Sequence, residues 1–141
     1  MTDPLHAYPG PGIQSRPLPE VLVLGSVRWS AILFGLGVGV LGLAVLSLVL
    51  WLVLTLLGVE GAAGAATTFG TLGGFVVAGW FAGRRAPYSY AFHGATAAMG
   101  IALAVVVTAV RAGSPAPTSQ VLLLAVLAIV LGGVAAHFAK R

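Results

Sequence analysis

The sequence predicts an all-α protein, a four-helix transmembrane bundle, and three observations support this prediction. Of the 141 residues, 59% are hydrophobic and only 7% are charged, whereas a soluble domain carries about 25% charged residues. The mean hydropathy is +1.05. The apolar residues fall into four runs, and each run is long enough to cross the hydrocarbon core of a bilayer as a helix.

Residues 1–26 differ from the rest of the chain because they hold five of the eight prolines. Proline removes a backbone donor and restricts the residue before it. We therefore predict a disordered, cytoplasmic, Pro-rich arm at 1–26 and a membrane domain at 27–141. A cleaved signal peptide is not expected, because the apolar run that follows is much longer than the apolar core of such a peptide.

The four predicted spans cover residues 29–57, 62–83, 91–110 and 121–139. In the first, Trp29 and Trp51 lie about 33 Å apart along a helix, which matches the two aromatic belts of a bilayer. The other three spans follow short breaks that contain Gly or Pro, such as Gly58–Gly61 and the loop with Pro115 and Pro117. These residues end one helix before the next begins.

The distribution of basic residues predicts the orientation. Four spans place both termini on one side of the membrane, and that side carries most of the Lys and Arg residues: Arg16, Arg28, Arg84, Arg85, Lys140 and Arg141. The other side has only Arg111, together with Glu60. The positive-inside rule therefore predicts that both termini face the cytoplasm.

Small residues recur at every fourth position of the second span, which predicts close helix packing. In lipid, helices gain little from hydrophobic association, so small residues that let backbones approach are favoured at their interfaces. A row spaced by four drifts by about 40° per step around a helix, so either one partner crosses along it or two partners share it. The predicted packing residues, with matching positions on the first and fourth spans, are Gly35, Gly39, Ala66, Gly70, Gly74, Ala78, Gly79, Gly83 and Gly132. Alternatively, the glycines line a pore.

Four residues near the cytoplasmic ends are candidate contacts for a partner or for lipid: Arg84, Arg85, His93 and His137. Arginine anchors helix ends and recognises phosphate and carboxylate groups. The histidines are expected to bond to water or backbone, and a metal-ligand or proton-carrier role is the alternative. Because the chain has no cysteine and no acid near these histidines, we predict no metal site and no cofactor.

Several function classes are disfavoured. No Asp, Glu, Lys or Arg lies in the middle of a span, whereas ion-coupled transporters usually keep an ionisable group near the midplane. No serine has a His and acid partner at a recognisable spacing, and Gly70–Gly74 lacks the ending of a phosphate-binding loop, so an enzyme is not expected. The basic residues flank apolar runs, which argues against nucleic-acid binding. Threonines such as Thr67, Thr68 and Thr71 could line a polar path, so transport stays an alternative.

The second span ends in Ala-Gly-Arg-Arg-Ala (Ala82–Ala86), and His93-Gly94 opens the third. With the four-span layout, this order resembles a family of small bacterial four-span membrane proteins of unknown function, over about residues 26–139. The resemblance implies a bacterial inner-membrane location and supplies no catalytic residues. The overall prediction is a structural or accessory bundle that binds a second copy or a membrane-protein partner. The alternative is a small channel or transporter.

Overall fold

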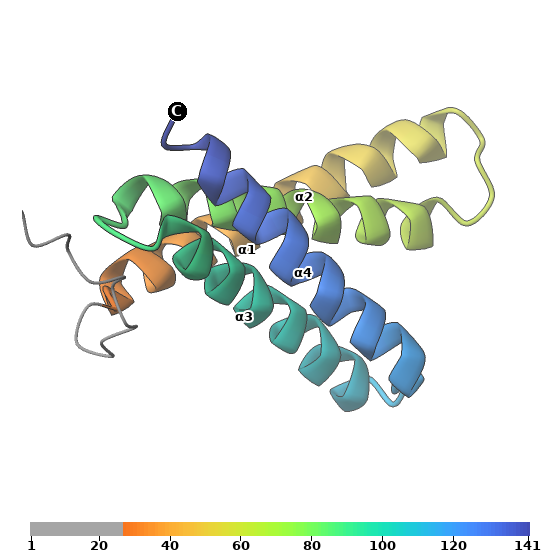
Figure 1. Cartoon of the computed structure of the whole chain (residues 1–141). Helices are drawn as coiled ribbons and strands as arrows, with labels where there is room; N and C mark the ends of the chain where they lie inside the picture. The colour runs from red at the N-terminus through yellow and green to blue at the C-terminus, as the bar shows by residue number, and fades with distance from the viewer. Residues whose placement is uncertain (1–26) are drawn as a thin grey trace, which may run out of the picture.

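The computed structural model describes residues 27–141, which form an all-α bundle (Figure 1). The helices are α1 (Trp29–Leu56), α2 (Ala62–Arg85), α3 (Tyr90–Arg111) and α4 (Thr118–Phe138). All four are long and apolar enough to cross a membrane. The predicted class, an all-α fold with four membrane-capable helices, is therefore confirmed. The predicted arm lies outside the described residues, and the orientation of the bundle stays a prediction.

The helix boundaries differ from the predicted spans by one to three residues. The second helix includes Arg84 and Arg85 and stops at Ala86, which is extended with φ −73° and ψ 127°. Pro87 follows, and a residue before proline is pushed out of the helical region. The fourth helix begins directly after Pro117 rather than three residues later.

The helix α2 lies at the centre of the bundle. It packs against α1, α3 and α4, whereas α1 and α4 are not neighbours. Successive helices run antiparallel, so α1 and α3 begin at the same end of the bundle at which α2 and α4 finish (Figure 1). We call this end, around residues 27–39, 78–98 and 132–141, the packed end. The end with the loops 57–61 and 112–117 is the open end.

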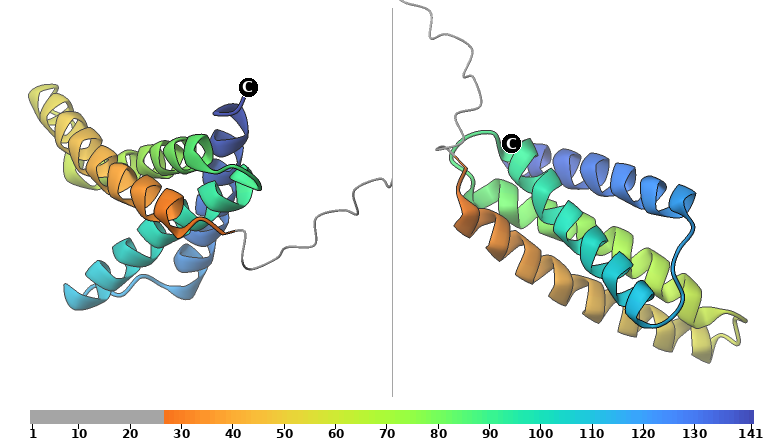
Figure 2. Two further views of the ribbon diagram at one scale, coloured as in Figure 1. Left: turned by 90° about the vertical axis from the view of Figure 1, so that its left-hand side faces the viewer. Right: turned by 90° about the horizontal axis from the view of Figure 1, so that it is seen from below.

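The two helical hairpins diverge from the packed end toward the open end. In Figure 1 and in the left view of Figure 2 the α1–α2 loop and the α3–α4 loop lie apart, while the other ends gather together. Burial follows the same gradient. The buried residues of α1 all lie between Ala31 and Gly39, and those of α4 all lie between Ala128 and Ala136. The packed end therefore holds most of the core.

The core consists mainly of alanine with three larger side chains. Phe75 is fully buried, Ile101 is 1% exposed and Ile32 is 5% exposed. Around them lie alanines from three helices: Ala78, Ala82, Ala97, Ala98, Ala102 and Ala128. Such small side chains bring helix backbones close together, and this approach favours association inside a bilayer.

Candidate functional site

The row of small residues on α2 follows one partner, α1. A Cβ on Gly35 would lie 2.6 Å from Ala82 Cβ and 2.7 Å from the backbone oxygen of Ala78. A Cβ on Gly39 would lie 2.5 Å from Ala78 Cβ. These distances leave no room for a side chain, so only glycine permits the approach. Gly70 and Gly74 also face α1. Between Gly70 and Ala82 the row therefore meets one partner and is not shared by two.

A second set of glycines joins α2, α3 and α4 at the packed end. A Cβ on Gly79 would collide with the backbone of Gly132, and one on Gly83 would lie 2.6 Å from the Cα of Ala136. A Cβ on Gly132 would in turn lie 2.6 Å from the backbone oxygen of Gly94. We call Gly79, Gly94 and Gly132 the glycine junction. Helix backbone meets helix backbone here, so no side chain separates these three helices at the glycine junction.

Gly94 was not among the predicted packing residues. Its position is recognisable in hindsight, because Gly94, Ala98 and Ala102 are spaced by four on α3, and all three are buried. The predicted residue Ala66 is also buried, at 1% exposure. It lies toward the open end, beside a hollow that it lines with Ser47 and Trp51 of α1.

His93 is a structural link and not a surface group. Its ring is 1% exposed, and its Nε2 accepts a hydrogen bond from the backbone N–H of Arg28 at 3.1 Å. Its Nδ1 lies 3.0 Å from the carbonyl oxygen of Ser89. The backbone donor fixes Nε2 as the acceptor, so Nδ1 is the nitrogen that donates to the Ser89 carbonyl. These bonds agree with the prediction that the histidines bond to water or backbone. The His93 ring is too deeply buried to contact lipid or a partner at the surface.

The other three candidate contacts are exposed at the packed end. The guanidinium carbon of Arg85 lies 3.4 Å from the ring centroid of Phe34. His137 Nε2 lies 3.3 Å from Nη2 of Arg141, and the His137 ring lies 5.8 Å from that of Tyr90. Within residues 27–141, no group of three or more His, Cys, Asp or Glu side chains could hold a metal ion.

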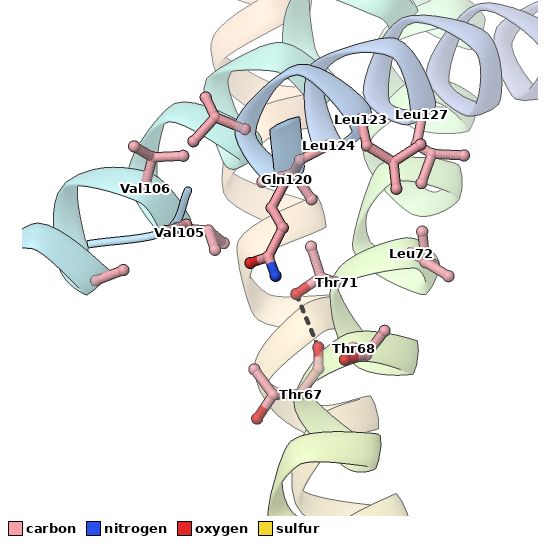
Figure 3. A pocket seen from close by; sticks show the side chains of 13 residues that line it. Thr67, Thr68, Thr71, Leu72, Val105, Val106, Gln120, Leu123, Leu124 and Leu127 are labelled. Carbon is pink, nitrogen blue, oxygen red and sulfur yellow. Dashed lines mark hydrogen bonds between the residues drawn. The ribbon is translucent and has the colours of Figure 1, made fainter. Parts of the chain in front are cut away.

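A cleft of about 330 Å³ opens between α2, α3 and α4 toward the open end (Figure 3). Aliphatic side chains form most of its wall. The polar lining is three threonines and one glutamine. Each threonine hydroxyl donates to the carbonyl four residues earlier, at 2.8–2.9 Å. The lining residues are Thr67, Thr68, Thr71, Leu72, Val105, Val106, Ala109, Ala116, Gln120, Val121, Leu123, Leu124 and Leu127.

Gln120 supplies the only free side-chain donor in the lining. Its amide points toward Thr71 in Figure 3 and makes no hydrogen bond within the described part of the chain. No charged side chain lines the cleft. A cleft of this size and polarity lies in the range of small-molecule sites, and its lining contains no His, Cys or Ser side chain.

No protein-family model, curated protein or solved structure matches the chain.

Proposed function

We propose that the chain is a structural or accessory bundle of a membrane assembly and not an enzyme. The observation that carries this proposal is the glycine junction, where the backbones of three helices touch. Such packing supports a rigid element that holds other components in place. It does not favour a conduit, which needs a continuous path between helices.

The proposal includes a partner inside the membrane, either a second copy or another membrane protein. The half of α1 toward the open end leaves large apolar side chains exposed over several turns, among them Val45, Leu48 and Leu52. In a bilayer this surface is compatible with lipid or with another helix. Purification in native lipid, followed by mass spectrometry, tests the idea. We expect a stable oligomer or a partner protein, and a monomer with only lipid would contradict it.

We further propose that the protein lies in the bacterial cytoplasmic membrane with its packed end in the cytoplasm. The packed end carries Arg28, Arg84, Arg85, Lys140 and Arg141, whereas the open end carries Arg111 and Glu60. This difference supports the orientation, because short cytoplasmic loops are enriched in Lys and Arg. The bacterial location rests on the family resemblance of the sequence.

A small channel or transporter is the second candidate, and the cleft is the observation that favours it. The cleft exposes threonine hydroxyl oxygens and one carboxamide toward the open end of the bundle, as a vestibule would. If solute passes here, the variants Gln120→Leu and Thr68→Val should slow its entry into proteoliposomes, because both remove polar lining. Both side chains are exposed, so these variants should leave the helix packing unchanged.

A further inference from the structure

The packed end carries an exposed basic surface made of five side chains: Arg28, Arg84, Arg85, Lys140 and Arg141. Among residues 27–141 the only acidic side chain is Glu60, which lies at the open end. No carboxylate side chain of the described bundle therefore neutralises the basic surface. Its charge is complementary to an anionic ligand.

One member of the basic surface, Arg85, stacks on an aromatic ring. Its guanidinium lies over the face of Phe34 at 3.4 Å from the ring centroid. Phe34 packs edge-on against Phe81 with 6.2 Å between the ring centroids. Stacking uses the flat face of the guanidinium and leaves the N–H groups at its edge free to donate. A cation held in this way loses less conformational freedom when it binds an anion.

The depth of this stacked pair indicates the kind of anion. Arg85 is the last residue of α2, and Phe34 lies in the second turn of α1. The pair therefore lies where a membrane helix passes from the hydrocarbon core into the head-group region. Phosphate is the anion that lipids present at this depth, and the planar guanidinium matches two of its oxygens.

We propose that Arg85, seated on Phe34, binds the phosphate of an anionic phospholipid in the leaflet at the packed end. Arg84 and the other members of the basic surface add attraction to the net negative head group. Each basic residue near an anionic membrane surface strengthens binding by roughly fivefold. The inference is independent of the accessory role, because a bound lipid would suit a bundle or a channel equally.

The test uses the full chain in mild detergent, equilibrated with mixed micelles of phosphatidylglycerol and phosphatidylcholine. Native mass spectrometry then counts each bound lipid. The wild type should retain phosphatidylglycerol in preference to phosphatidylcholine. The variant Arg85→Gln should lower this preference roughly fivefold. Arg85→Lys should also lower it, because lysine keeps the charge but loses the planar stack.

The matched control is Arg111→Gln, which removes one exposed positive charge at the open end. It should leave the lipid preference unchanged. Phe34→Leu should lower the preference while keeping every charge, and circular dichroism checks that this variant is folded. Equal loss in Arg111→Gln, full preference in Arg85→Gln, or full preference in folded Phe34→Leu would overturn the proposal. Displacement of the lipid by inorganic phosphate would also overturn it, because a free anion would then be the ligand.

Discussion

At the scale of single residues, His93 shows how a polar group can stabilise an apolar bundle. The ring accepts one hydrogen bond from the backbone N–H of Arg28, directly before α1, and donates one to the backbone oxygen of Ser89, directly before α3. Arg28 lies 65 positions before His93, whereas Ser89 lies four positions before it. The ring therefore ties the beginning of the bundle to its middle. The sequence indicated that His93 lies at the end of the bundle where α3 begins. It could not show that the ring is buried, because the burial depends on the backbone of the distant Arg28.

The variant His93→Ala should destabilise the bundle by about 1–3 kcal/mol, since it leaves the part-buried backbone N–H of Arg28 without its acceptor. The measurement is unfolding in a denaturing detergent, followed by circular dichroism. The exposed His137→Ala is the matched control and should change the stability by less than about 0.5 kcal/mol. Equal stability of the two variants would show that the His93 bridge is not needed.

At the scale of the helices, the sequence revealed the elements but only part of their pairing. Four long apolar runs determine the number and order of the helices, because only about 20 apolar residues are needed to span a bilayer. The row of small residues on α2 indicated close packing. It could not indicate which neighbour it meets, since the row drifts around the helix and matching residues occur on both α1 and α4. Side-chain shape along the whole interface makes that choice.

Two glycines on the same helix allow a test of the α1–α2 contact. A Cβ at Gly39 would lie 2.5 Å from Ala78 Cβ, whereas a Cβ at Gly37 would meet nothing within 4 Å. Gly39→Ala should therefore destabilise the bundle by about 1–3 kcal/mol through overpacking. Gly37→Ala should be neutral or stabilising by up to about 1 kcal/mol, because alanine is the better helix former. Thermal unfolding in detergent compares the two, and the opposite order would contradict the packing described here.

At the scale of the whole molecule, the helices are tightly packed at the packed end, and the two hairpins diverge toward the open end. The sequence alone did not predict this shape, because the angle between the hairpins depends on contacts between distant helices. A signal for it is present in the sequence nonetheless. Glycine and alanine crowd the packed-end parts of α1 and α4, such as Gly35, Gly39, Gly132 and Ala136, whereas Leu and Val dominate their open-end parts. The cleft follows from the divergence of the hairpins.

The orientation of the whole molecule can be tested without a background signal, because the chain has no cysteine. A single cysteine can be introduced at either of two exposed loop positions, Ser114 at the open end and Tyr88 at the packed end. With the packed end in the cytoplasm, a membrane-impermeant maleimide should label Ser114→Cys in intact spheroplasts and label Tyr88→Cys only after lysis. The reverse pattern would contradict the proposed orientation.

The most direct test of the accessory-bundle proposal is solute flux through the wild-type protein in proteoliposomes. Because helix backbones meet at Gly79, Gly94 and Gly132, we expect small ions and neutral solutes to cross no faster than they cross protein-free liposomes. Protein-dependent flux that falls in Gln120→Leu would contradict this proposal, because the cleft would then be part of an open path and the chain would be a channel or transporter.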